Sequence, residues 1–348
     1  MVKILSFAEA LEDAHARCDD LTVLLGNGFS IEYDHEKFAY ESLAAEATLE
    51  SLSVSKEELF AQLGTSNFEI IVDKLHTAAI IQSLYGGSNE IISKLKSDAT
   101  VVRNGLADAL AVRHPDSARS LLSEELTHAR TFLGNFSRIF TLSYDLLLYW
   151  VVNGDDHGIR VPRSDGFEYE DWHQQGPLIW KKKPSQARQR IYFLHGALHL
   201  FVKNSRLTKL AYGLGSPIID TLRTKLEAGE YPLVVTEGTR NEKEARIERS
   251  AYLRNSLRRF GEVEGALFMH GFSMSHNDDH ILQAVSTAAS KVEALYVALH
   301  GDRRSTGAKA LIARAQAVKA DRVANGGANL RLRFYDSSTA NAWRDNSI

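Results

Sequence analysis

Residues that can do chemistry stand directly after apolar runs of the chain, or a few residues beyond them, at four places. They are Ser143 and Asp145 after residues 138–142, His195 after 191–194, Gly238 and Thr239 after 232–236, and Asn277 and Asp278 after 266–271. A histidine can take up a proton near neutral pH, and a hydroxyl, amide or carboxylate can orient a sugar or a water molecule. One such residue alone is more often a loop residue or a helix cap, and Asn277 or Asp278 is well placed to cap a helix. Several of them predict one site, because the carboxyl ends of parallel strands meet at one crevice.

The sequence LTVLLGNGFS at residues 21–30 is an apolar run followed by two glycines. It predicts a buried strand that enters a glycine turn. Gly26 and Gly28 permit backbone angles that side chains forbid, and they let main-chain N–H groups approach an anion at a helix start. A short glycine motif also occurs in ordinary tight turns. Its position directly after the first buried strand favours a cradle for the phosphates of a dinucleotide.

Short apolar runs and helix-length segments indicate how these residues are positioned. The runs are mostly continuous, which is typical of strands covered on both faces in a parallel sheet. They lie at residues 22–25, 138–142, 191–194, 232–236, 266–271, 294–299 and 329–335. Helical segments at residues 241–260, 278–290 and 306–324 separate the later runs. This alternation predicts an α/β fold with a Rossmann-like, doubly wound parallel sheet.

The region between the first two runs breaks this alternation. Apolar side chains recur there at helical spacing, over residues 67–85, 90–112 and 117–133. We predict a helical subdomain at residues 38–135, inserted between the first and second strands of a sheet domain formed by residues 1–37 and 136–348. A second irregular stretch, residues 153–190, predicts a long loop with short hairpins. Near the start, Ser6 and Glu9 have the spacing of a capping box and predict a first helix.

Composition narrows the classes of function. The net charge of −3 argues against broad electrostatic contact with nucleic acid, although residues 253–260 form a local basic segment. No stretch approaches the ~20 apolar residues of a membrane helix, and the first residues lack the apolar core of a signal peptide. Cys18 is the only cysteine, which excludes an intramolecular disulfide and a multi-cysteine zinc site. We therefore expect a cytoplasmic protein without membrane contact, and we assign no metal ligand.

Five motifs, taken in order, resemble those of the sirtuin-like domains of bacterial immunity proteins, in the branch that opens with a G-N-G-F-S turn. They are GNGFS at residues 26–30, TLSYD at 141–145, FLHG at 193–196, EGT at 237–239 and GFSMSHNDDHI at 271–281. The resemblance implies binding of NAD⁺ and its hydrolysis to nicotinamide and ADP-ribose. It implies nucleotide contacts from Gly26, Asn27, Gly28, Phe29, Ser30, Gly238, Thr239, Gly271, Ser273, Asn277 and Asp278.

The chemistry of this reaction suggests roles for four residues. The bond to nicotinamide breaks through a transition state with positive charge on the ribose, so the site must fix the ribose and take up a proton. His195 is the predicted proton acceptor, and Asp145 and Asn27 are expected to orient the ribose, the nicotinamide amide or a water. Ser143 stands where the family has asparagine, so one hydroxyl replaces an amide that both donates and accepts. Serine can act through a bridging water, or it can leave a domain that binds NAD⁺ and cuts it slowly.

Three functions stay open at this point. The first is an NAD⁺ glycohydrolase acting as an effector of anti-phage defence, held inactive by oligomerisation or a partner. For it the resemblance suggests a homo-oligomer and a hexameric HerA-type ATPase. The second, motivated by Ser143, is a sensor or scaffold that binds NAD⁺ or ADP-ribose without turnover. The third is a nuclease subunit, supported only by paired acids and a basic face, Asp278-Asp279 and Arg254, Arg258 and Arg259. Peptide deacylation is not expected, because the four-cysteine zinc of sirtuin deacylases is excluded.

Overall fold

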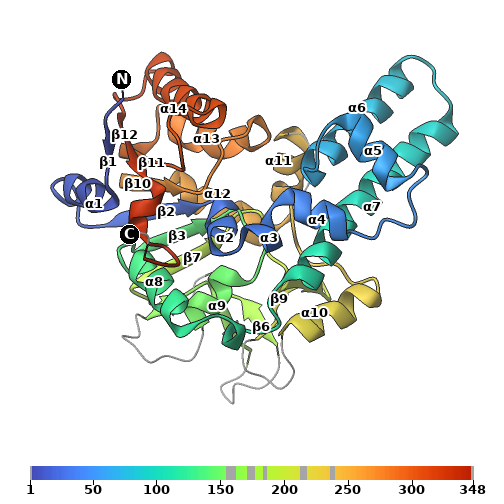
Figure 1. Ribbon diagram of the computed structural model, residues 1–348, viewed down its shortest axis with the longest axis horizontal. Coiled ribbons are helices and arrows are strands. Elements are labelled where there is room, and N and C mark those ends of the chain that lie inside the picture. Colours follow the sequence, from blue (N-terminus) through green and yellow to red (C-terminus); the bar gives the residue numbers. More distant parts are fainter. Residues whose placement is uncertain are drawn as a thin grey trace.

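The computed structural model describes residues 2–153, 162–170, 177–182, 186–211, 218–235 and 240–345. Its centre is an eight-stranded sheet in which every neighbouring pair is parallel. In spatial order the strands are β1 (Ile4–Leu5), β12 (Arg331–Asp336), β11 (Lys291–Leu299), β10 (Glu264–His270), β2 (Leu21–Leu25), β3 (Arg138–Thr141), β7 (Gln189–Phe193) and β4 (Arg163–Ser164). Helices lie on both sides of this sheet (Figure 1). The predicted α/β fold with a Rossmann-like, doubly wound parallel sheet is confirmed.

Six of these strands have the order of a Rossmann sheet. Along the chain, β2, β3 and β7 extend from the centre to one side, and β10, β11 and β12 extend to the other. The order therefore reverses between β2 and β10, which pair as far as Leu25 and His270. Ligands of open parallel sheets bind beyond the carboxyl ends of the strands at such a reversal. A ligand site is therefore expected where β2 and β10 end.

Alternate residues of the central strands pack into two hydrophobic cores. Leu24 and Phe140 share one core with α12, α13 and α14, while Val23 and Ile139 share the other with α1, α8 and α9. Successive side chains of a strand point to opposite faces, so a continuous apolar run fills both cores. The bounds of these helices are α1 (Phe7–His15), α8 (Ser123–Gly134), α9 (Leu147–Asn153), α12 (Ala251–Gly261), α13 (Asp279–Ser286) and α14 (Thr306–Ala324).

Between β2 and β3, the described chain forms helices and no strand. They are α2 (Gly28–Tyr33), α3 (His35–Phe38), α4 (Tyr40–Glu46), α5 (Lys56–Leu63), α6 (Phe68–Leu84), α7 (Asn89–Arg113), η1 (Ala118–Ser120) and α8. Figure 1 shows α5, α6 and α7 extending away from the sheet. Phe68 and Val102 nevertheless belong to the same hydrophobic core as Val23 of β2. A separate subdomain bounded at residues 38 and 135 stays a prediction.

One predicted strand is not part of the sheet. Residues 232–235 form no strand, and Val234 makes only an isolated antiparallel bridge to Gly196. The segment instead follows the loop after β7, where the Val235 N–H donates to the carbonyl of His195 at 2.8 Å. An apolar run of this length has the same pattern whichever backbone it pairs with, so the sequence alone does not decide its partner.

A small antiparallel sheet lies beside the main one. Its strands, in spatial order, are β5 (Phe167–Tyr169), β6 (Leu178–Trp180), β9 (Arg206–Lys209) and β8 (Leu200–Lys203). The antiparallel pairing of β5 with β6 falls within residues 153–190, where short hairpins were expected. The pairing of β8 with β9 was not predicted.

Local capping decides several helix ends. The predicted capping box is confirmed, because the Ser6 hydroxyl accepts from the Glu9 N–H and the Glu9 carboxylate accepts from the Ser6 N–H. The single helix predicted at residues 241–260 is two helices, α11 (Arg240–Arg249) and α12, since the side chain of Ser250 caps α12. The remaining helices are α10 (Ile218–Glu227), η2 (His276–Asp278) and η3 (Ser337–Ala340). Among the described residues, no helix is both long enough and apolar enough to cross a membrane.

Candidate functional site

A cavity of about 690 Å³ lies where β2 and β10 end, at the reversal of strand order. Its wall brings together most of the residues predicted from separate strand ends. They are Gly26, Asn27, Gly28, Ser143, His195, Gly271, Ser273, Asn277 and Asp278. The helices between β2 and β3 complete the wall through Tyr40, Glu69 and Leu106. The predicted nucleotide residues Gly238 and Thr239 lie outside the described residues.

The glycine turn after β2 meets the loop after β10 at backbone distance. A Cβ atom on Gly26 would lie 2.3 Å from the carbonyl oxygen of Gly271, and one on Gly28 would lie 2.6 Å from the Cα of Gly271. Gly271 has a φ of +65°, a conformation that side chains disfavour. All three positions therefore exclude a side chain, and the close approach of the two loops explains why.

The N–H groups of this turn are largely used within the protein. Gly26 and Gly28 donate to the carbonyls of His270 and Gly271 at 2.9 and 2.8 Å, and the next two residues donate back into the turn. The expected phosphate cradle needs correction on this point. The glycines join two strand ends and shape the cavity wall, while the N–H groups of Gly26 and Gly28 are already bonded and are not free to hold an anion.

Three predicted site residues support this wall from behind and do not line it. Phe29 is buried against Trp343, which donates its indole N–H to the Phe29 carbonyl at 2.7 Å. The buried Ser30 hydroxyl donates to the carboxylate of Asp145, whose other oxygen accepts from the N–H of Leu147. Asp145 therefore links α2 to the start of α9. The direct contact with ribose or nicotinamide that we expected from Asp145 is not what this geometry provides.

Ser143 and Asn27 do face the cavity. The Ser143 hydroxyl is buried, and it has no hydrogen-bond partner among the described residues. The Asn27 side-chain amide donates to the carbonyl of Phe38 at 3.3 Å, which fixes the side chain at the cavity wall. A buried hydroxyl without a partner costs free energy, and a polar ligand atom in the cavity would remove that cost.

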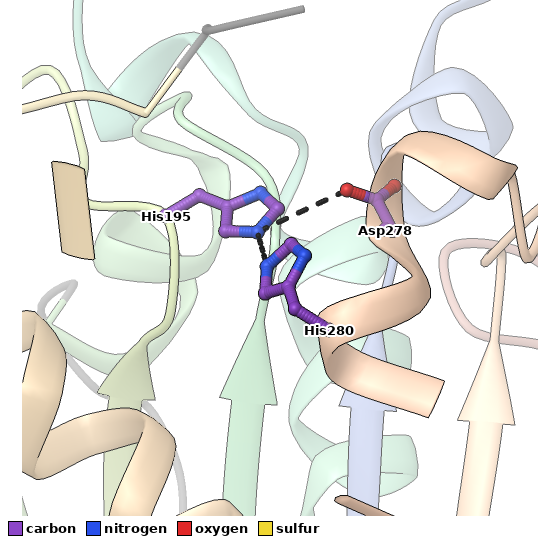
Figure 2. Close-up of side chains that lie close together, drawn as sticks. All are labelled: His195, Asp278 and His280. Carbon is purple, nitrogen blue, oxygen red and sulfur yellow. Dashed lines mark hydrogen bonds and ion pairs between the residues drawn. The ribbon is translucent and has the colours of Figure 1, made fainter. Parts of the chain in front are cut away.

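His195 meets two residues of the segment that follows β10. Its Nε2 lies 3.0 Å from Nε2 of His280 and 3.9 Å from Oδ1 of Asp278. Figure 2 shows the two imidazole rings facing each other beside the carboxylate. Burial, with the nearby Lys243 and His280, holds the pKa of His195 well below its usual value. Burial and the charges of Lys243 and Arg240 lower the pKa of His280 to about 3. Both shifts favour the neutral imidazole, which is the form that can accept a proton.

A buried ionic network stands behind this pair. Nζ of Lys243 lies 2.7 Å from Oε2 of Glu69 and 2.8 Å from Oδ1 of Asp278, and the lysine side chain has no exposed surface. The Tyr144 hydroxyl also donates to Glu69. Burial by itself would lower the pKa of Lys243, but the two carboxylates outweigh it and raise that pKa. Burial raises the pKa of Asp278, and the Lys243 ammonium opposes this rise.

Most of this network has no recognisable signal in the sequence. Lys243 lies in the charged run RNEKEAR, which has the pattern of an exposed helix. Glu69 reads as an ordinary acid in the first turn of a helix, and Asn67 caps that helix. His280 belongs to the segment 271–281 that we singled out, and its position two residues after Asp278 is the one signal that was available.

The two adjacent acids that suggested a nuclease contact different partners. Asp278 contacts Lys243, whereas Asp279 pairs with Arg314. The basic face is also neutralised in part, since Arg258 and Arg259 both pair with Glu262. Two adjacent acids that point apart do not form a shared metal site, and this removes the main support for the nuclease hypothesis.

Comparison with protein families adds a classification. The family model described as "Domain of unknown function (DUF4917)" matches residues 23–343. The chain belongs to this family. The match includes the glycine turn, every strand-end motif and the buried network. No curated protein matches the sequence. The family carries no assigned activity, so the function has to be argued from the cavity itself.

Proposed function

We propose that the protein binds NAD⁺ in the cavity beyond β2 and β10 and hydrolyses it to nicotinamide and ADP-ribose. The observation that carries the proposal is the buried Ser143 hydroxyl, which faces the same cavity as His195 and lacks a partner among the described residues. The cavity volume of about 690 Å³ falls within the range of roughly 300–1,000 Å³ that ligand pockets have. Its place at the reversal of strand order is where Rossmann-like sheets bind nucleotides.

The proposed reaction consumes one water and releases one proton. The glycosidic bond to nicotinamide breaks, positive charge develops on the ribose, and water adds to the sugar carbon. Ser143 and Asn27 orient the ribose or the water, while His195 takes up the proton of the water. The resulting imidazolium lies 3.9 Å from Asp278, whose carboxylate stabilises it. Because neutral His195 is a weak base in this environment, we expect slow turnover in the isolated protein.

A second candidate, a sensor that binds NAD⁺ or ADP-ribose without turnover, is favoured by one observation. Nε2 of His195 is in contact with His280, and the pKa of His195 is strongly lowered. A histidine with a strongly lowered pKa positions ligands well and removes protons poorly.

The biological setting of the proposal rests on the resemblance to sirtuin-like immunity proteins. An enzyme that destroys NAD⁺ is toxic when it is always active. We therefore propose an effector of anti-phage defence that is restrained as a homo-oligomer or by a partner of the HerA-type ATPase class.

The test is to incubate the purified protein with NAD⁺, alone and with the product of the neighbouring gene, and to measure nicotinamide by chromatography. We expect nicotinamide release that His195→Ala lowers by about 100-fold or more and Ser143→Asn increases. The matched control is His276→Ala, because His276 lies in the same segment with a side chain that is 79% exposed. Binding of NAD⁺ measured by calorimetry without any nicotinamide release would favour the sensor. Absence of NAD⁺ binding would contradict both candidates.

A further inference from the structure

Three metal-ligating side chains converge at one edge of the cavity. His195 comes from the loop after β7, Asp278 from η2 and His280 from α13 (Figure 2). Their donor atoms all lie within 4.8 Å of one another, and this is the one such group of three or more found in the part of the chain that the structure describes. The sequence predicted no metal ligand. The convergence joins His195 to His280, which lies 85 residues later in the chain.

The donor geometry is close to that of a metal centre. Zn²⁺ binds imidazole nitrogen at about 2.0–2.1 Å, so two ligands in a tetrahedral site lie roughly 3.3 Å apart. The two Nε2 atoms are already 3.0 Å apart and face each other. Oδ1 of Asp278 lies 3.9 Å from Nε2 of His195 and 2.8 Å from Nζ of Lys243. Binding a metal would draw this oxygen about 0.6 Å towards His195 and away from the ammonium. All three donor atoms lie within 4.8 Å of one another, so the widest separation has to shorten by at most about 1.5 Å.

The protonation and charge of the cluster also suit a cation. Metals bind neutral imidazole, and His195 and His280 are both buried, which disfavours the charged form. The carboxyl groups of Asp278 and Glu69 face one ammonium, that of Lys243. A divalent cation at the imidazole nitrogens is therefore beside Asp278, and the charge of Lys243 is shared between Asp278 and Glu69.

We propose that His195, Asp278 and His280 bind one divalent transition-metal cation of the Zn²⁺ class. Imidazole and carboxylate ligands suit this class better than Mg²⁺ or Ca²⁺, which prefer oxygen ligands alone. His195 and Asp278 line the cavity, so the remaining coordination position is open to a water or to a ligand in the cavity.

Given the proposed function, a bound cation would regulate the hydrolysis of NAD⁺. A metal on Nε2 of His195 occupies the lone pair that takes up the proton from water. The metal-bound protein should release nicotinamide more slowly than the metal-free protein, and a chelator should restore the rate. The cation then acts as a restraint on the site.

The experiment uses the full chain, treated with a chelator, dialysed and titrated with Co²⁺, followed by displacement with Zn²⁺. We expect about one equivalent of Co²⁺ with the visible absorption of a low-symmetry, four- or five-coordinate ion. His195→Ala and His280→Ala should each weaken binding more than about tenfold. His276→Ala is the matched control and should bind as the wild type does. A wild type that binds no Co²⁺ or Zn²⁺, or a His280→Ala variant that binds as tightly as the wild type, would overturn the proposal.

A second measurement guards against variants that fold poorly. Zn²⁺ should raise the melting temperature of the wild type, since a ligand that binds only the folded state stabilises it. It should not raise that of His280→Gln, whose own melting temperature shows whether it folds. An equal rise in both proteins contradicts the site. The outcome is separate from the proposed function. Metal binding by a protein whose metal-free form releases no nicotinamide leaves the metal site intact and rejects the enzyme. Nicotinamide release by a protein that binds no metal rejects the site alone.

Discussion

The central sheet carries a hollow at each end, and the two differ in chemistry far more than in size. The one beyond the carboxyl ends has a volume of about 690 Å³ and the one at the amino ends about 750 Å³. The amino-end hollow is lined by charged residues at strand starts, among them Arg138, Glu264 and Lys291. Lys291 pairs with Glu264 there, but the two side chains are 67% and 58% exposed. At the carboxyl end, Lys243 is fully buried between its two carboxylates.

This difference shows why volume alone does not identify a site. Exposed ion pairs contribute about 0–1 kcal/mol and are replaceable, because water solvates either partner alone. A buried lysine has lost its hydration, so its charge is tolerated only while the carboxylates that pair with it are present. Burying these charges costs desolvation free energy. Buried, mutually dependent titratable groups in a cleft are typical of functional sites. We therefore favour the smaller hollow, at the carboxyl ends of the strands, as the functional site. Three experiments test this choice.

The largest expected effect comes from removing the buried ammonium. Lys243→Met leaves Glu69 and Asp278 facing each other without a cation, and we expect a loss of about 3–5 kcal/mol in the free energy of unfolding. Lys291→Met, the matched change at the amino end, should cost less than about 1 kcal/mol. Urea unfolding of both variants measures the contrast. Equal losses of unfolding free energy in the two variants would contradict the difference between a buried lysine at the carboxyl end and an exposed one at the amino end.

A smaller effect is expected from the glycine turn. Gly28→Ala forces a Cβ against the backbone of Gly271, where no flexible side chain can give way, and should cost about 1–3 kcal/mol together with affinity for NAD⁺. Gly261→Ala provides the control, because it lies at the helix end beside the amino-end hollow with no atom within 4 Å of the added Cβ. It should be neutral or stabilising by up to about 1 kcal/mol. Calorimetry with NAD⁺ and thermal unfolding would reveal the difference, and an unimpaired Gly28→Ala would refute the close approach.

The smallest effect concerns acid stability at His114, which follows Leu110 of the cavity wall by one helical turn at the end of α7. Burial lowers the pKa of His114 to about 4, and its Nε2 accepts from the N–H of Leu146 at 3.0 Å. The folded pKa lies below the unfolded value of about 6.5, so the unfolded state binds more protons and stability falls as the pH drops from 6.5 towards 4. Between pH 7 and 5.5 this histidine should account for about 1 kcal/mol.

His114→Gln keeps an acceptor for Leu146 but does not titrate, so that part of the acid sensitivity should disappear. His276→Gln, a change at an exposed histidine, should leave it unaltered. Urea unfolding at pH 7.0 and 5.5 gives the comparison. No histidine is among the residues that line the amino-end hollow in the described structure, so a similar acid response arising there would be unexpected.

Much of the fold followed from patterns that are local in the chain. Continuous apolar runs identified six strands of the parallel sheet, because a strand covered on both faces needs apolar side chains at successive positions. The capping box at Ser6 and Glu9 fixed the start of α1, since both hydrogen bonds form within four residues. The position of Ser143, His195 and Asp278 after strands was enough to predict that they would meet.

Other features were decided only by tertiary structure. Residues 232–235 pair with the loop after β7, and the glycines of the turn serve to contact Gly271. The ion pair of Glu69 with Lys243 and the contact of His195 with His280 each join distant parts of the chain. The sequence by itself determined which segments are strands and where polar groups stand on them, because hydrophobic periodicity and capping act over a few residues. Which polar groups meet, and how burial changes their pKa, depends on long-range packing that no local pattern records.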